Sequence, residues 1–270
     1  MPNIGIDIGG TKIAAGVVCD GNILEKLTLP TYPDRGQGAV VDDVAKLCRQ
    51  LMEGFSNVTS VGIGCPGVVD PINGTVIKAD NLGFRNVSIS QEMSGLLKLP
   101  VYLENDANCA ALGEHLYGAA TGYKNSITIT IGTGIGGGII LDDKIYTGTF
   151  FAAGEVGHQT IVVNGEACTC GQLGCWEAYA SGTALQRLSG ILNKDFLNYL
   201  TTGLANLVNI LQPEIMVIGG GVSQLGQPLL TGIKQNVTDK IFDQRGLTKF
   251  ELAKLGNNAG IIGASLLGGM

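Results

Sequence analysis

The sequence predicts an α/β protein made of two related lobes. Short runs of β-branched residues alternate with segments of helical periodicity along the 270 residues. A glycine-rich hairpin pattern near the N-terminus returns about half-way along the chain, and a repeat of this kind indicates a duplicated domain rather than a solenoid. An apolar content of 45% provides the side chains that two modest cores need.

The first lobe is expected to open with a β-hairpin. Residues 3–8 form an apolar strand, Gly9 and Gly10 turn the chain, and residues 13–18 form the second strand. The elements expected next are a helix, two strands and a second helix with an apolar side, over residues 39–55, 60–64, 101–103 and 107–117.

The second lobe is expected to repeat the hairpin, with strands at residues 127–131 and 139–141 around Gly132-Thr133-Gly134. A helix around residues 204–211, a strand at 215–218 and a glycine turn at 219–221 follow. A final helix over residues 259–267 is expected to pack back on the first lobe. We therefore predict a small lobe of residues 1–118 plus 257–270 and a larger lobe of residues 119–256.

Composition excludes several classes of function. A net charge of −6 without a run of Lys or Arg argues against a nucleic-acid partner and against an acidic membrane surface. The most apolar stretch, residues 127–141, is interrupted by five glycines, so no membrane span is expected. The N-terminus lacks the pattern of a signal peptide. We expect a soluble, cytoplasmic protein, with its four isolated cysteines (Cys19, Cys48, Cys65 and Cys109) reduced and buried.

The glycine turns are candidates for a nucleotide site. The segment from Asp7 to Lys12 fits neither the Walker pattern nor the dinucleotide fingerprint, because a strand follows it instead of a helix. Its open backbone amides, with Thr11 and Lys12, can hold phosphate oxygens while Asp7 orients Mg²⁺. An ordinary hairpin turn is the alternative, but the second turn at 132–134 favours a polyphosphate held from both sides. The turn at 219–221 can form a wall for a base.

Three cysteines and one histidine predict a metal site. His158, Cys168, Cys170 and Cys175 offer an imidazole and three thiolates from one short segment, which is a closed tetrahedral zinc set without an open position for water. A disulfide is the alternative, but it leaves one cysteine unpaired. The other histidine, His115, is expected to be a surface residue or a satisfied residue in its helix.

Three carboxylates are candidates for binding and catalysis. Glu155 and Glu177 lie near the metal set, where acceptors beside an imidazole N–H oriented by the metal suit a polyhydroxylated ligand; solvated surface residues are the alternative. Asp106 follows a strand and begins a helix, and it can accept the proton of a hydroxyl group that receives a phosphoryl group. Asn105 can bind sugar hydroxyls. Helix capping is the alternative for Asp106.

These motifs resemble those of the ROK family (repressors, open reading frames and kinases) of the actin-like ATPase superfamily, especially its bacterial glucokinase-type sugar kinases. The resemblance runs nearly the full length of the chain and is carried by residues 7–12, 64–67, 104–106, 131–138, 155–158, 168–177 and 219–221. It implies a duplicated ribonuclease H-like fold with a cleft between the lobes, and assembly as a homodimer or homotetramer.

The resemblance also implies residue roles in an ATP-dependent hexose kinase. Asp106 would be the base that deprotonates the accepting hydroxyl, usually O6 of glucose. The sugar would be bound by Gly67, Asn81, Asn105, Asp106, Glu155, His158 and Glu177. MgATP would be surrounded by Asp7, Gly9, Gly10, Thr11, Lys12, Thr133, Gly134 and Gly220.

One departure from the family pattern is a short segment over residues 184–215, on the adenine side of the predicted site.

The sequence leaves two other functions open. The substrate can be an N-acetylated hexosamine (N-acetylmannosamine or N-acetylglucosamine) or a β-glucoside, because that choice depends on pocket shape. A non-catalytic sugar-sensing protein is the alternative of another class. A DNA-binding repressor is not expected, because the first strand begins at about residue 3.

Overall fold

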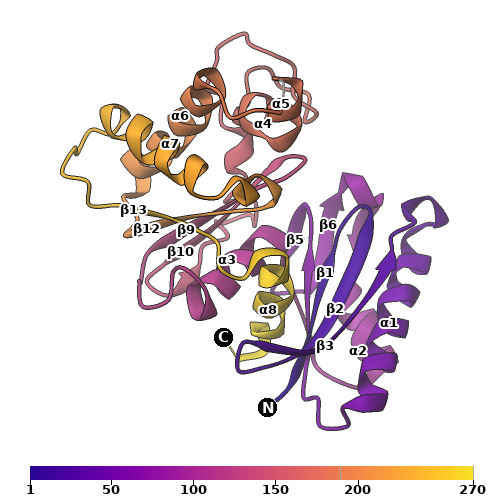
Figure 1. Cartoon of the computed structure of the whole chain (residues 1–270). Coiled ribbons are helices and arrows are strands. Elements are labelled where there is room, and N and C mark those ends of the chain that lie inside the picture. The colour runs from indigo at the N-terminus through magenta and orange to yellow at the C-terminus, as the bar shows by residue number, and fades with distance from the viewer. Residues whose placement is uncertain (189, 270) are drawn as a thin grey trace. The chain divides into compact units, whose positions relative to one another are not determined.

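The computed structural model in Figure 1 describes residues 1–188 and 190–269. The chain divides into two compact units. The first unit comprises Met1–Tyr117, Thr147–Ala152 and Asn257–Met270, and the second comprises Gly118–Tyr146 and Ala153–Gly256. This division assigns residues 147–152 to the first unit, whereas the predicted lobes leave them in the second.

The first unit is built on a five-stranded sheet with the order β3-β2-β1-β4-β8. Its antiparallel part is β1, β2 and β3, and β4 and β8 continue it in parallel. The strands are β1 (Asn3–Ile8), β2 (Lys12–Cys19), β3 (Asn22–Pro30), β4 (Val61–Cys65) and β8 (Val101–Asn105). The helices are α1 (Gln37–Gly54), α2 (Ile89–Leu97), α3 (Asp106–Tyr117) and α8 (Ala259–Ser265).

Alternation along β1 explains how helices cover both faces of this sheet. Ile4 and Ile6 are fully buried in one core with residues of α1 and α2. Gly5 faces α8, where a Cβ atom would lie 1.8 Å from the Ile261 carbonyl oxygen, and Gly62 of β4 meets the Ala264 carbonyl at 1.7 Å. Only glycine permits this contact between helix backbone and sheet. The prediction that the last helix packs on the first lobe is confirmed.

A small three-stranded sheet with the order β5-β6-β7 also belongs to the first unit and was not predicted. Its strands are short and antiparallel, and they are β5 (Val68–Asp70), β6 (Thr75–Ala79) and β7 (Phe84–Val87).

The second unit repeats the topology of the first. Its five-stranded sheet has the order β11-β10-β9-β12-β13, with an antiparallel part followed by two parallel strands. The strands are β9 (Ser126–Ile131), β10 (Ile135–Leu141), β11 (Lys144–Ile145), β12 (Ile215–Gly219) and β13 (Lys249–Leu252). The helices are α4 (Trp176–Ala180), α5 (Gly182–Arg187), α6 (Lys194–Leu211) and α7 (Gln227–Val237).

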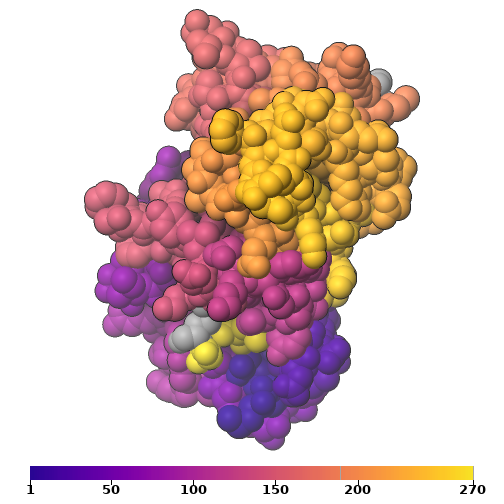
Figure 2. Space-filling model, turned by 90° about the vertical axis from the view of Figure 1, so that its left-hand side faces the viewer, coloured from indigo at the N-terminus to yellow at the C-terminus, as the bar shows by residue number. Residues whose placement is uncertain are grey.

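Ile127, Ile129 and Ile131 of β9 pack in one buried core with residues of α6 and α7, as Ile4, Ile6 and Ile8 of β1 pack with α1 in the first unit. The predicted duplication of an α/β lobe is therefore confirmed at the level of strand order and core pattern. Figure 2 shows the last part of the second unit, coloured orange to yellow, as one continuous stretch of surface.

Several local predictions need correction. Helix α6 begins at Lys194, where the Asn193 side chain accepts from the Phe196 N–H and caps it, so it is ten residues longer at its start than the predicted 204–211. His115 is 4% exposed, so of its two predicted interpretations the surface one is wrong and the satisfied residue within helix α3 holds. Cys19 is only half-buried, whereas Cys48, Cys65 and Cys109 are buried as expected.

Within the described residues, no helix has the length and apolar character needed to cross a membrane.

Candidate functional site

The turn between β1 and β2 presents open backbone amides. The Gly9 N–H donates to the Lys12 carbonyl oxygen at 2.9 Å, and Thr31 donates through its N–H to the Thr11 carbonyl and through Oγ1 to the Gly9 carbonyl. Within the described chain this leaves the N–H groups of Gly10 and Thr11 without a protein acceptor. Consecutive free N–H groups beside the exposed Lys12 side chain form an anion-binding surface.

Asp7 lies on β1, directly before this turn. Burial raises the pKa of its carboxyl group, and the charges of Lys12 and Lys26 oppose that rise. Lys26 also donates to Asn258 Oδ1 at 2.7 Å, and Gly260 of α8 approaches so closely that a Cβ atom would lie 3.2 Å from the Asp7 carboxylate. Lys26 was not predicted, because a single Lys in an exposed strand carries no motif.

The β8–α3 junction positions Asn105 and Asp106. Asn105 Oδ1 accepts from the N–H groups of Ala107 and Asn108 at 2.9 and 3.1 Å, so Asn105 supplies the helix cap. Its Nδ2 donates to the Gly67 carbonyl at 3.0 Å, which brings two predicted sugar-binding residues together. Asp106 begins α3 with a half-buried carboxylate. The Asn81 side chain lies beside Gly10 of the glycine turn.

The buried side chain of Glu104 accepts two hydrogen bonds from this junction. It is 5% exposed, and its Oε1 accepts from the Asn105 N–H at 2.7 Å and from Asn108 Nδ2 at 2.9 Å. Burial raises the pKa of Glu104, and the two hydrogen bonds oppose the rise. The sequence predicts no role for Glu104, because sequence alone does not show which residue of the tripeptide 104–106 points inward.

Replacing Glu104 by Gln is expected to change the pH dependence of stability. Because the folded pKa is raised above the unfolded one, the contribution of Glu104 is full below about pH 4.3 and is lost as pH rises through the folded pKa. The melting temperature of Glu104→Gln should therefore rise relative to that of the wild type as pH increases above about 4.3. Thermal melts of both proteins test this, with Glu53→Gln on the exposed side of α1 as the control. If the melting temperatures of Glu104→Gln and the wild type change with pH in parallel, the prediction is contradicted.

The second turn, between β9 and β10, is held by a neighbouring segment. Glu177 Oε2 accepts from the Ile135 N–H at 2.9 Å, Gly182 N–H donates to the Gly132 carbonyl at 2.8 Å, and Thr183 Oγ1 donates to the Thr133 carbonyl at 2.9 Å. A Cβ atom on Gly134 would lie 2.2 Å from Glu177 Oε2, so a side chain at this position would displace the Glu177 carboxylate from the Ile135 N–H. In the described chain the Thr133 and Gly134 N–H groups have no protein acceptor. Both glycine turns thus offer a pair of free amides.

A pocket of about 550 Å³ adjoins the second turn. Its lining includes Gly132 and Thr133 of the turn, and it continues through Gly182, Thr183, Leu185, Gln186, Gly190, Gly221, Val222, Gln224 and Leu225. Gly220 itself packs against Ile131 with a φ of +77°, and its neighbour Gly221 lines the pocket. The lining combines glycine and threonine residues with the apolar side chains of Leu185, Val222 and Leu225, a mixture that is typical of small-molecule sites.

The predicted metal ligands converge. The ligand atoms of His158, Cys168, Cys170 and Cys175 all lie within 4.8 Å of one another. The Cys170 and Cys175 sulfur atoms are 3.7 Å apart, and Cys168 Sγ is 3.7 Å from His158 Nδ1. Tetrahedral zinc with Zn–S bonds of about 2.3 Å separates its sulfur ligands by about 3.8 Å. The residues therefore fit a closed, four-coordinate zinc ion, and among the described residues no disulfide joins them.

The imidazole of His158 is oriented for a second contact. Nδ1 faces the sulfur cluster, while Nε2 lies 3.9 Å from Glu155 Oε2. A metal on Nδ1 would leave Nε2 as an N–H donor on the side of Glu155, whose side chain is exposed. Glu177 is half-buried, and its Oε1 lies 3.4 Å from Thr169 Oγ1 and 3.7 Å from Cys168 Sγ.

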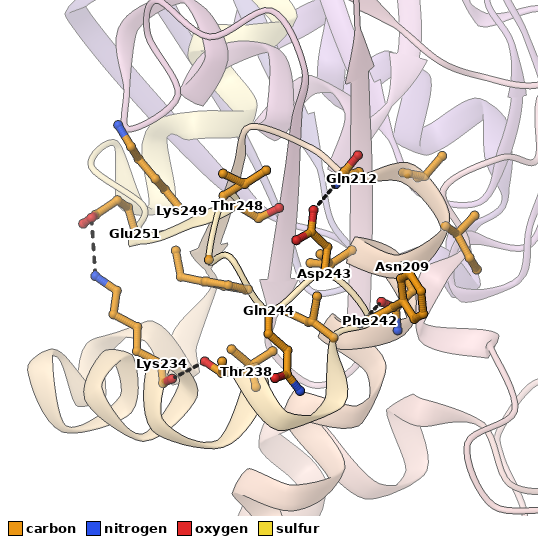
Figure 3. Close-up of a pocket in the computed structure, with 18 residues that line it drawn as sticks. Asn209, Gln212, Lys234, Thr238, Phe242, Asp243, Gln244, Thr248, Lys249 and Glu251 are labelled. Carbon is orange, nitrogen blue, oxygen red and sulfur yellow. Dashed lines mark hydrogen bonds and ion pairs between the residues drawn. The ribbon is translucent and has the colours of Figure 1, made fainter.

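A larger pocket of about 670 Å³ lies elsewhere on the second unit, between the ends of α6 and α7 and strand β13 (Figure 3). Lys234 pairs with Glu251 across it, and Gln212 donates to Asp243. Its described lining shares no residue with the predicted sugar, nucleotide or metal sets.

Comparisons with known proteins agree with this chemistry. A family model described as the ROK family matches residues 3–196 and 191–268. A glucokinase of Streptomyces coelicolor is 36% identical over 97% of this chain and 96% of its own length. The N-acetylgalactosamine kinase AgaK of Shewanella sp. is 32% identical over 98% of this chain and 96% of its own length.

A solved structure of a ROK family glucokinase from Streptomyces griseus, in complex with glucose and AMPPNP, is similar at a TM-score of 0.87. The two proteins are 35% identical, and the similarity covers 98% of each chain. The fold of this chain is therefore the actin-like ATPase fold that the resemblance implied.

Proposed function

The chain belongs to the ROK family and is an ATP-dependent sugar kinase, and we propose that it transfers the γ-phosphoryl group of ATP to O6 of glucose. The observation that carries this proposal is the similarity, over 98% of each chain, to a glucokinase structure that holds glucose and AMPPNP. The pocket beside the Gly132–Gly134 turn supports it, because its volume and its free amides suit a nucleotide.

We assign the base to Asp106. The sugar oxygen attacks the γ-phosphorus, the bond to the bridging oxygen breaks, ADP leaves with the electron pair, and the hydroxyl proton passes to the Asp106 carboxylate. Its position next to Asn105, whose side chain is held by the helix cap and by Gly67, keeps this carboxylate in a defined place. Asn105 Oδ1 caps α3 through the Ala107 and Asn108 N–H groups, and Asp106 Oδ1 also accepts from the Ala107 N–H at 2.9 Å.

The proposed nucleotide set uses both glycine turns. On the first unit, the Gly10 and Thr11 amides with Thr11 Oγ1 and Lys12 bind phosphate oxygens, and Asp7 orients the waters of Mg²⁺, which neutralises charge on the phosphates when bound. On the second unit, the Thr133 and Gly134 amides bind phosphate, and the pocket that Gly221 lines receives the base.

The proposed sugar set comprises Gly67, Asn81 and Asn105 with Asp106 on the first unit, and Glu155, His158 and Glu177 on the second. His158 binds through its Nε2 N–H, and Glu155 accepts from sugar hydroxyls beside it. We infer that the cysteine and histidine cluster holds a structural zinc ion that fixes the direction of this N–H. Homodimer or homotetramer assembly and a cytoplasmic location stay predictions.

An ADP-release assay over glucose, mannose, fructose, N-acetylmannosamine, N-acetylglucosamine and a β-glucoside tests the substrate. We expect kcat/KM for glucose to exceed that for the N-acetylated sugars by about tenfold or more, because an extra acetamido group has to fit a pocket shaped for a hydroxyl. A preference for an N-acetylated sugar would support the second candidate, to which the likeness to an N-acetylgalactosamine kinase gives some weight. Sugar binding without ADP release would identify a sensor.

A further inference from the structure

We propose that residues 176–183 connect the metal loop to the nucleotide pocket, so that a metal ion and a nucleotide strengthen each other's binding. The metal site is the His158, Cys168, Cys170 and Cys175 cluster, and the pocket is the one beside the Gly132–Gly134 turn. The inference rests on the proposed nucleotide role of that pocket.

The connection begins at the metal. Cys175 is both a member of the cluster and the residue that precedes α4. The next residue, Trp176, is fully buried, donates through its N–H to the Gln159 carbonyl at 2.8 Å and through Nε1 to the Tyr199 carbonyl at 3.0 Å. Its ring lies against Gly203, where a Cβ atom would be 2.2 Å away. Because α4 is packed this tightly, a metal ion that fixes Cys175 also fixes the start of α4.

The connection ends at the turn. Glu177, Gly182 and Thr183 make the three hydrogen bonds that hold the turn, to Ile135, Gly132 and Thr133 respectively. Between them, Ser181 Oγ accepts from the Ala184 N–H at 3.1 Å and caps α5, which gives the segment a defined path. A displacement of α4 would therefore pull on backbone groups of residues 132–135.

The nucleotide would contact the same groups from the other side. Gly132 and Thr133 line the pocket together with Gly182 and Thr183, so the turn and the segment that holds it form one wall. A ligand that orders this wall stabilises the arrangement of α4 in which Cys175 binds metal. By thermodynamic linkage, the metal must then raise nucleotide affinity by the same factor.

Thr183 is a positioning residue in this scheme. Its hydroxyl hydrogen bond to the Thr133 carbonyl can be removed without a change in shape by Thr183→Val, and Thr183→Ser keeps the donor. The readout is the rate at which the zinc-loaded protein loses zinc to a chromogenic chelator, with and without MgADP. Trp176 is the only tryptophan of the chain, so its fluorescence reports on the connecting segment during the same experiment.

We expect MgADP to slow zinc release from the wild type by about fivefold or more. The ratio of the zinc-release rate without MgADP to the rate with MgADP should fall at least by about half in Thr183→Val, since one of three hydrogen bonds is lost. Thr183→Ser should keep the wild-type ratio. Calorimetry with MgADP is run first on the zinc-loaded wild type.

The outcomes separate the two proposals. If MgADP does not bind, the proposed nucleotide site fails and the coupling fails with it. If MgADP binds but leaves zinc release and Trp176 fluorescence unchanged, only the coupling is overturned. A wild-type ratio in Thr183→Val would overturn the route through residues 176–183. Every measurement starts from the folded, zinc-loaded protein, and the initial rate of zinc release is compared, so the stability of the metal-free form does not enter the comparison.

Discussion

The Asp106→Asn variant is expected to lose about 10²- to 10⁴-fold in kcat, because an amide cannot accept the proton of the attacking hydroxyl. Its dissociation constant for glucose should change only severalfold, since Asn keeps the size and one acceptor oxygen of the side chain. Steady-state kinetics and calorimetry with glucose measure the two quantities separately.

The matched control is Asp42→Asn, which makes the same change of charge on the exposed side of α1. It should retain wild-type kcat and KM. An unchanged kcat in Asp106→Asn would refute the assignment of the base, and loss of glucose binding together with kcat would show that Asp106 serves mainly as a sugar ligand.

The Cys170→Ser variant is expected to lose zinc and to bind glucose about tenfold or more weakly. A serine hydroxyl is a poor substitute for a thiolate in a closed site of four ligands. Without the metal, the imidazole of His158 is no longer held with Nε2 toward Glu155. Metal analysis of the purified protein and glucose titration measure the two effects.

Cys19→Ser is the matched control, because Cys19 lies outside the cluster in β2 and is only half-buried. It should keep one zinc ion per chain and normal glucose affinity. Full loss of zinc from Cys170→Ser with unaltered glucose affinity would break the proposed link between the metal and the sugar.

The fold was predictable where local patterns were strong. The two glycine hairpins, α1, α3 and the strands near them follow from β-branched runs, helical periodicity and glycine turns. Strand β3 was missed, although Asp20-Gly21 forms a two-residue hairpin turn with φ of 48° and 74°, which the Asp-Gly pair signals. The sequence of β3 gives no clear apolar alternation, because β3 is an edge strand with most side chains exposed.

The candidate site was predictable where one segment carries the whole motif. The metal set spans residues 158–175, and its ligand atoms come together as its spacing indicated. The hydrogen bond from Thr183 to Thr133 joins residues fifty positions apart, and no local pattern reveals it. Gly182-Thr183 is similar to the Gly-Thr pairs in both turns, but the same dipeptide also occurs at residues 74–75 and 148–149, so it does not mark the contact by itself. Likewise, the inward direction of Glu104 depends on packing around α3.

The most direct test of the kinase assignment follows transfer of the labelled γ-phosphoryl group of ATP to glucose by the purified, zinc-loaded protein. We predict many turnovers, one ADP for each sugar phosphate formed, and phosphate on O6 by NMR. ATP hydrolysis without labelled sugar, or glucose binding without any transfer, would contradict the account.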